Sequence, residues 1–319
     1  MSNTPALTVE RPSPPVKAKR HTSPTKRKQN RAAYLFLLPF FIVFITMLVI
    51  PLVYAGYLSL FESKLIGGSV FAGLANYARA LTDPQFLGGL GRVALFFIIQ
   101  VPIMLGLALF FALALDTMRA RGSKGIRLLI FMPYAVPAVV ATLMWGYLYG
   151  ADFGPIAQIA RAAGLGTPDF LSAGNILYSM MNIVTWEFIG YNMIIMYAAL
   201  RSIPGELYEA AEIDGAGQFR LAWSVKIPAI RPAIMLTVIF SIIGSFQLFA
   251  EPSLLDALAP AAITNGFTPN YYAYNLAFIN QELNYAAAVA FLLGLVIAVI
   301  SYFVQLGSER SARRERKGL

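Results

Sequence analysis

Six long apolar segments dominate the sequence and restrict the chain to one class of fold. They lie approximately at residues 32–61, 93–115, 128–149, 176–200, 233–250 and 285–306. A helix needs roughly 20 apolar residues to cross a bilayer. Five of the segments contain no Asp, Glu, Lys or Arg, and the fourth contains only Glu187. Since a backbone in lipid must satisfy its own hydrogen bonds, and since these runs lack the alternation of barrel strands, we predict an all-α polytopic membrane protein with six transmembrane helices.

The basic residues predict how these helices are oriented. Of 25 Lys and Arg residues, 21 fall in residues 1–31, the loop 116–127, the loop 201–232 and the C-terminal tail. Cytoplasmic segments carry such an excess of basic residues. We therefore expect a multi-pass protein of the cell membrane, with both termini and the loop 201–232 in the cytoplasm. This bias also accounts for the net charge of +9, so a nucleic-acid partner is not expected.

The two ends of the chain differ in composition from its centre. Residues 1–31 combine prolines and basic residues with few apolar ones, which predicts a disordered basic cytoplasmic tail. Residues 308–319 form a second basic cytoplasmic tail. The membrane domain is therefore expected to span residues 32–307. Its first apolar run is too long for the apolar core of a signal peptide, so we expect a retained helix.

Several kinds of chemistry are excluded by what the sequence lacks. There is no cysteine, and the single histidine, His21, lies in the basic N-terminal segment. Disulfides, thiol catalysis, Cys-based metal sites and a Ser-His-Asp set are therefore excluded. No Gly-x-x-x-x-Gly-Lys-[Ser/Thr] loop is present to hold nucleotide phosphates. We expect no catalytic residue, no metal site and no cofactor bound by this chain.

The loop 201–232 carries an ordered set of helix signals. Pro204 suits a first helical turn, and acidic residues follow it where the helix dipole favours anions. One face of this helix would present Leu207, Ala210, Ala211 and Asp214, spaced i, i+3, i+4 and i+7. The two alanines make that face shallow, so a partner could approach closely.

A turn and a second helix are expected to follow. Asp214-Gly215 is a turn signal, because Gly215 can adopt a positive φ. The second helix is expected to run to about Ile227 and to end before Pro228.

The order Glu209-Ala210-Ala211, then Gly215, then Ile227-Pro228 resembles the EAA loop of ABC importer permeases. The strings GLANYARALTDPQF at 73–86, FMPYAVPAVVATLMWGYLYG at 131–150 and WEFIGYNMIIMYAALRSIPGELYEAAEIDGA at 186–216 are similar to the carbohydrate-importer branch of that family. The resemblance covers nearly the whole chain after residue 31. The resemblance implies that the chain is the permease subunit of an ATP-driven, binding-protein-dependent importer, which works by alternating access.

The resemblance also implies partners and a coupling site. The partners would be a second homologous permease, an ABC ATPase dimer that binds ATP and Mg, and an extracytoplasmic solute-binding protein, all at the lipid bilayer. The loop would be a cytoplasmic pair of coupling helices that docks on the ATPase. Its coupling residues would be Leu207, Glu209, Ala210, Ala211, Asp214 and Gly215.

A substrate pathway is expected in the helices on either side of this loop. Glu187 lies about 20 Å from the cytoplasmic end of the fourth helix, near mid-membrane, where a charge is costly unless it faces protein or water. In maltose-type relatives, sugar contacts cluster in these two helices. The matching positions would be Glu187, Tyr191, Ser241, Gly244, Ser245 and Leu248. Helix packing remains open for the serines and the glycine, and Gln100 is expected to form an interhelical hydrogen bond.

A sugar or oligosaccharide is the expected solute, with glycerol phosphate or a polyamine as alternatives. Similar proteins often have a basic residue at position 187, where this chain has Glu187. An anionic solute would favour basic residues in the cavity, whereas a cation could favour Glu187. A secondary transporter would show inverted repeats and several intramembrane charges, and the sequence shows neither.

Overall fold

A computed structural model describes residues 24–64, 68–117 and 123–317, and it divides into two units, residues 1–54 and 55–319. The first unit contains α1 (Pro24–Phe44), the π turn η1 (Ile45–Val49) and the start of α2 (Ile50–Ser59). Residues 24–31 therefore belong to a helix, whereas the sequence predicted a disordered tail there. A proline in the first turn, followed by Lys, Arg, Gln and Ala, favours this helix. Residues 1–23 of the expected tail lie outside the described residues.

The second unit begins with the end of α2, and a short hairpin that the sequence pattern did not indicate follows it. Strand β1 (Phe61–Lys64) pairs antiparallel with β2 (Gly68–Phe71), with Phe61 opposite Phe71. Strands of four residues give too little alternation to be recognised in a sequence. Helix α3 (Ala75–Thr82) follows and leads to the first long helix of the unit.

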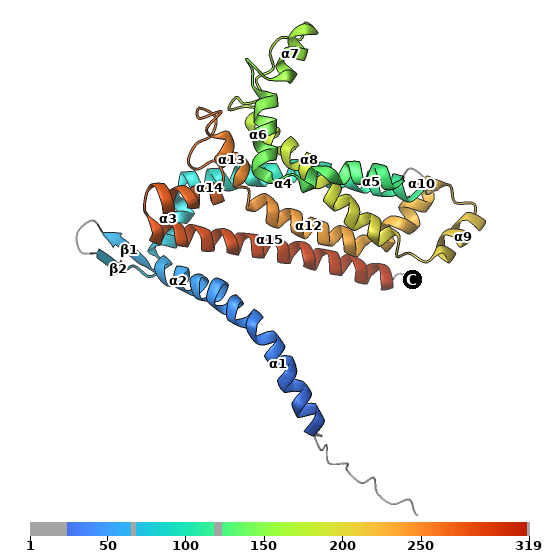
Figure 1. Ribbon diagram of the computed structural model, residues 1–319, viewed down its shortest axis with the longest axis horizontal. Coiled ribbons are helices and arrows are strands. Elements are labelled where there is room, and N and C mark those ends of the chain that lie inside the picture. The colour runs from blue at the N-terminus through green and yellow to red at the C-terminus, as the bar shows by residue number, and fades with distance from the viewer. Residues whose placement is uncertain (1–23, 65–67, 118–122, 318–319) are drawn as a thin grey trace, which may run out of the picture. The chain divides into compact units, whose positions relative to one another are not determined.

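Four long helices form the body of this unit (Figure 1). They are α4 (Pro84–Thr117), α8 (Ile176–Leu200), α12 (Arg231–Phe246) and α15 (Leu283–Lys317). Helix α8 has the bounds predicted from the sequence, whereas α4 begins earlier than predicted. Helix α15 continues through most of the segment expected to be a separate C-terminal tail.

The third predicted span is broken, which corrects the expectation of one continuous helix. It consists of α5 (Ser123–Phe131), the 3₁₀ turn η2 (Met132–Ala135) and α6 (Ala138–Tyr149). The two parts meet at an angle of 94°. Val136 has an extended backbone (φ −79°, ψ 128°), as expected for a residue before proline, and Pro137 thus separates the two parts. Helix α7 (Pro155–Ala162) follows α6.

The fifth span is also interrupted. Helix α12 ends at Phe246, short of the predicted boundary, and α13 (Ala250–Leu255) continues after a three-residue break. The segment between the fifth and sixth predicted spans contains α14 (Pro269–Tyr274) and the π turn η4 (Asn275–Ile279). Threonine supplies the N-cap of α14, because the Thr268 hydroxyl accepts a hydrogen bond from the N–H of Tyr271 at 3.3 Å.

Helices α4 and α8 lie side by side and form the most extensive helix contact of the unit (Figure 1). Their shared core contains Val101, Met104, Leu105, Ala108, Ala112, Met193, Met196 and Leu200, all buried. Helix α12 packs against α4 and α15. The broken third span reaches α8 at Gly190, where an added Cβ would lie only 2.1 Å from the carbonyl oxygen of Ile130.

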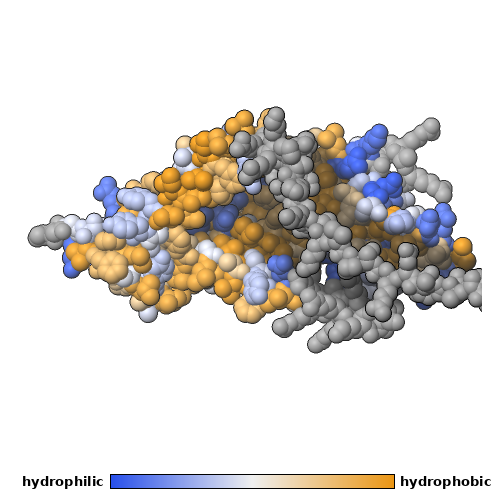
Figure 2. All heavy atoms as spheres, turned by 90° about the horizontal axis from the view of Figure 1, so that it is seen from below, coloured by the Kyte–Doolittle hydropathy of each residue, from blue (hydrophilic) through white to orange (hydrophobic). Residues whose placement is uncertain are grey.

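Several of the described helices have the length and composition of membrane spans. Five are long and apolar enough to cross a bilayer, or six if the bent pair counts as one span. Figure 2 shows that hydrophobic residues cover most of the coloured surface of the face it draws. The predicted fold class, an all-helical polytopic membrane protein, is confirmed.

Candidate functional site

A cavity of about 610 Å³ opens between the long helices of the second unit. Helices α4, α8 and α12, the turn η2 and the segment after α12 all contribute side chains to it. This volume falls within the usual range for small-molecule sites, roughly 300–1,000 Å³. Its lining comprises Gln100, Met104, Tyr134, Val184, Phe188, Tyr191, Asn192, Phe240, Ser241, Gly244, Ser245, Gln247, Leu248, Phe249, Ala250, Glu251 and Asn270.

One wall of the cavity is aromatic. The rings of Tyr134 and Tyr191 stack with 4.8 Å between centroids and 22° between planes, and Phe188 contacts Tyr134 edge-on. Gly190 permits this arrangement, because any side chain there would collide with the backbone that leads to Tyr134. Such a surface, with phenol hydroxyls at its edge, suits a ligand that has both an apolar face and polar groups.

The other walls offer uncharged polar groups. The Oδ1 atom of Asn192 is buried and has no hydrogen-bond partner among the described residues, while its Nδ2 donates to the carbonyl of Phe188 at 3.0 Å. Ser245 donates to the carbonyl of Ser241 at 2.7 Å. A buried acceptor without a partner is costly, so Asn192 is an unsatisfied polar group at the wall of the cavity.

The charge that lines the cavity is negative. Glu251, at the start of α13, is the one charged residue among the described residues that line it, and it is 6% exposed. No described Lys, Arg or His lines the cavity.

Five of the six residues expected in the substrate pathway line this cavity together: Tyr191, Ser241, Gly244, Ser245 and Leu248. Glu187 does not line it. Its side chain is buried beside the cavity, with Oε2 unpartnered among the described residues and with Glu251 within electrostatic reach. Gln100 donates to the hydroxyl of Thr185 on α8 at 3.2 Å, which confirms its expected interhelical hydrogen bond, although it also faces the cavity.

Local sequence patterns did not indicate several of the cavity residues that lie outside α8 and α12. Tyr134 lies in the 3₁₀ turn of the broken span, and Glu251 and Asn270 lie between the fifth and sixth predicted spans. An intramembrane carboxylate is a recognisable signal. Glu251 carried no such signal, because the fifth span was predicted to end at residue 250.

The loop 201–232 forms a helix, a turn and a second helical segment. Helix α9 (Gly205–Ile213) begins directly after Pro204, and α10 (Gln218–Leu221) follows the turn. Gly215 has a φ of +75°, as predicted. The N–H groups of Gly215 and Ala216 bond to the carbonyls of Glu212 and Ala211 at 3.0 and 2.9 Å. These two bonds form a Schellman cap, which requires the left-handed residue.

The second helical segment does not end before Pro228. It continues through the π turn η3 (Ala222–Lys226) into α11 (Ile227–Ala229). Pro228 follows the π turn directly, so the N–H that proline lacks falls where the regular i→i−4 hydrogen-bond pattern is already interrupted. The end predicted at Ile227 is therefore wrong.

The surface of these helices is exposed and partly apolar. Glu209, Ala210, Asp214 and Gly215 are exposed, Ala211 is half-buried, and Leu207 is 50% exposed. Three large apolar residues that the sequence pattern did not single out are also exposed here: Ile213, Phe219 and Trp223 are 85%, 83% and 69% exposed. The exposed surface of α9, α10 and η3 therefore combines acidic and large apolar side chains.

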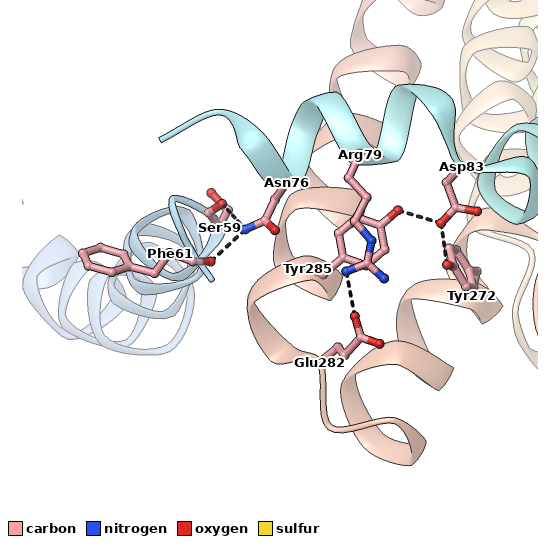
Figure 3. Close-up of polar contacts among 8 residues, drawn as sticks. All are labelled: Ser59, Phe61, Asn76, Arg79, Asp83, Tyr272, Glu282 and Tyr285. Carbon is pink, nitrogen blue, oxygen red and sulfur yellow. Dashed lines mark hydrogen bonds and ion pairs between the residues drawn. The ribbon is translucent and has the colours of Figure 1, made fainter. Parts of the chain in front are cut away.

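A polar cluster ties α3 to α14 and α15 (Figure 3). Arg79 pairs with Glu282 at 2.9 Å, and the hydroxyls of Tyr272 and Tyr285 each donate to Asp83 at 2.6 Å. Burial alone would raise the pKa of Asp83, but these two hydrogen bonds and those from the backbone of Gln85 and Phe86 lower it below its ordinary value. The cluster therefore favours the ionised carboxylate.

No group of three or more His, Asp or Glu side chains that could hold a metal ion occurs within the part of the chain that the structure describes.

Comparison with protein families identifies a match to a family described as "Binding-protein-dependent transport system inner membrane component", over residues 104–316. This range includes most of the cavity lining and the whole of the loop 201–232.

Known proteins with similar sequences cover nearly the whole chain. The lactose transport system permease protein LacF of Rhizobium radiobacter is 31% identical over 301 residues, which cover 92% of this chain and 98% of that protein. The sn-glycerol-3-phosphate transport system permease protein UgpA of Agrobacterium fabrum is 30% identical over 272 residues, or 85% of this chain and 92% of that protein.

A solved structure shares the fold. A chain of a bacterial alginate ABC transporter, in complex with an alginate pentasaccharide-bound periplasmic protein, superimposes with a TM-score of 0.80 at 20% sequence identity. The match covers 90% of this chain and 96% of that one.

Proposed function

Since the chain belongs to the family of binding-protein-dependent transport system inner membrane components, we propose that it forms half of the pore of an ATP-driven importer for a sugar or oligosaccharide. The chain is a multi-pass inner-membrane permease. Members of this family have no catalytic activity and bind no cofactor, and the ATPase is a separate subunit. The solute, the site residues and the remaining partners are parts of the proposal.

The stacked Tyr134–Tyr191 wall beside uncharged polar groups is the observation that carries the sugar proposal. A pyranose ring has an apolar face and a rim of hydroxyls. The aromatic wall would contact the face, and Asn192, Ser241 and Ser245 would bond the hydroxyls. Similarity to a lactose permease over nearly the full length supports the same class of solute.

The charge of the cavity favours some of the alternative solutes over others. A glycerol phosphate would need cations, and the described lining contains none, although a similar permease is named for sn-glycerol-3-phosphate. A polyamine would suit Glu251, with the buried Glu187 nearby. The aromatic wall and the many neutral polar groups favour the sugar, and the polyamine remains the second candidate.

The exposed surface of α9 and α10 is proposed to dock on the ATPase subunit. Leu207, Ile213 and Phe219 would supply the apolar contact, and Glu209 would meet a basic residue. Truncating one partner of a desolvated charge pair typically costs about 2–5 kcal/mol. Glu209→Lys should therefore reduce co-purification of the ATPase subunit while the permease still inserts. An undiminished yield of the ATPase subunit would contradict this docking assignment.

The proposed importer has other components besides this chain. A second homologous permease completes the pore, an ATPase dimer drives alternating access, and an extracytoplasmic binding protein delivers the solute. The excess of basic residues in the tails and in the loop 201–232 supports a cytoplasmic position for both termini and this loop.

The absence of cysteine permits a direct test of the pathway. A Cβ at Gly244 meets nothing within 4 Å, so Gly244→Cys would place a thiol in the cavity. In the assembled transporter, a water-soluble maleimide should label it in one conformational state, and the transported sugar should slow the labelling. Ala108→Cys is the control, because Ala108 is fully buried in the α4–α8 core. If Gly244→Cys never reacts, or if only polyamines protect it, the sugar pathway is wrong.

A further inference from the structure

A buried ion pair joins the loop 201–232 to the end of α4. Lys226 Nζ lies 2.6 Å from Asp116 Oδ2, and the two side chains are 5% and 6% exposed. The residues are 110 positions apart in the sequence. Asp116 lies in the last turn of α4, and Lys226 ends the π turn η3.

The π turn is what directs Lys226 inward. Leu221, Lys226 and Ile230 are buried, while Trp223 between them is 69% exposed. A regular α-helix would align residue 221 with residue 225. The wider turn, with its i→i+5 bonding, instead brings Lys226 onto the buried face. Such single π turns occur frequently at functional sites.

The first coupling helix reaches the same ion pair. Tyr208 of α9 places its ring 5.1 Å from Lys226 Nζ, and its hydroxyl donates to the carbonyl of Leu200 at the end of α8. Burial, and then the charge of Asp116, raise the pKa of Tyr208, while Arg201 opposes them. Both helical segments of the loop and the ends of α4 and α8 therefore meet at Lys226 and Asp116.

Stability alone does not explain a buried ion pair at this place. Replacing a buried ion pair with apolar residues of similar volume is often neutral or stabilising, because desolvation offsets the Coulomb attraction. A short ion pair with a defined geometry does, however, hold the π turn η3 at one position on α4. Along α4, Asp116 is 12 residues, or about 18 Å, from Met104, which lines the cavity.

We propose that Lys226 and Asp116 are positioning residues that transmit movement of the coupling loop to α4, and so to the wall of the solute cavity. This inference depends on the proposed function, in which α9 and α10 dock on the ATPase. A displaced loop would carry Lys226 with it. Asp116 would follow, because neither charge can be left unpaired in its apolar surroundings.

The test measures how far ATP changes the access of a water-soluble reagent to the cavity. The complete transporter is reconstituted with Gly244→Cys in this chain, and the rate of labelling by a water-soluble maleimide is measured with and without ATP. The pair of substitutions Lys226→Gln and Asp116→Asn is introduced into this background, and it removes both charges while leaving two polar side chains that can hydrogen-bond. Lys226→Arg is the conservative variant. Arg79→Gln with Glu282→Gln removes the exposed pair at α3 and is the matched control.

The doubly neutral variant should still assemble and hydrolyse ATP. The ATP-dependent change in labelling rate should fall by about fivefold or more, because about fivefold is the lower end of the coupling factors typical of two coupled sites. Lys226→Arg and the control pair should retain the full change. If the doubly neutral variant keeps the full change per ATP hydrolysed, or loses only abundance, the pair is merely structural and the inference is wrong. If the reference protein itself shows no ATP-dependent change, the proposed function fails instead.

Discussion

Tyr134 stacks on Tyr191, with 4.8 Å between the ring centroids, although one residue lies in a 3₁₀ turn and the other in the middle of a long helix. The contact exists because the broken third span brings its turn against α8. Gly190, next to Tyr191, leaves the space for this approach. The aromatic wall of the cavity therefore depends on a missing side chain in α8 and on a proline break in another span.

Gly190→Ala should reduce the abundance of the folded permease. Its Cβ would lie 2.1 Å from the carbonyl oxygen of Ile130, which backbone movement alone can relieve. Overpacking of this kind costs about 1–3 kcal/mol. Gly244→Ala is the matched control for folding, because its Cβ meets nothing within 4 Å. Membrane abundance and the midpoint of thermal unfolding check the prediction, and equal values for the two variants would contradict it.

Tyr191→Ala should lower solute uptake at unchanged abundance. The residue is partly exposed and lines the cavity, so its loss removes a contact surface and not a core side chain. Tyr191→Phe keeps the ring and should retain most of the uptake if stacking dominates. Uptake rates per folded permease at several solute concentrations separate the two variants. If Tyr191→Ala transports as well as the wild type, the aromatic wall does not contact the solute.

The sequence predicted the elements whose signals are local. The bounds of α8 were correct because residues 176–200 are apolar and flanked by turn signals. The turn at Gly215 was correct because a positive φ selects glycine. Pro137 was visible in the sequence, but the bend that it produces, 94°, depends on how the two parts pack.

Contacts between distant residues could not be read from local patterns. Asp116 and Lys226 each appeared as one of several charges near a predicted helix end, and only the fold joins them. The same holds for Glu251, whose burial depends on the packing of α13 against α6. Glu187 was predicted to line the pathway because of its depth. Depth along a helix does not determine which side of the helix faces the cavity.

The stability that Asp83 supplies should depend on pH. Its pKa is lowered in the folded protein, so it stabilises the fold above its ordinary pKa of 3.8, and this contribution is lost as the pH falls through the lowered value. The midpoint of thermal unfolding of wild type should exceed that of Asp83→Asn by a constant amount between about pH 5 and 7. The difference should shrink below about pH 4. A difference that persists at the lowest pH at which both proteins fold would show that the carboxylate charge is not responsible.

Gly215→Val should weaken docking of the ATPase subunit, and so impair transport, more than Gly217→Val. Gly215 has a φ of +75°, where a β-branched residue is strained, whereas Gly217 has an extended backbone with φ −66° and ψ 165° that any residue adopts. Strain of about 1–2 kcal/mol would open the Schellman cap that sets the angle between α9 and α10. Both glycines are exposed and a Cβ at either meets nothing within 4 Å, so packing does not distinguish them. The amount of ATPase subunit that co-purifies with each variant, normalised to permease abundance, measures the effect. A lower amount for Gly215→Val alone supports the left-handed turn as part of the docking surface, and equal amounts would remove that role.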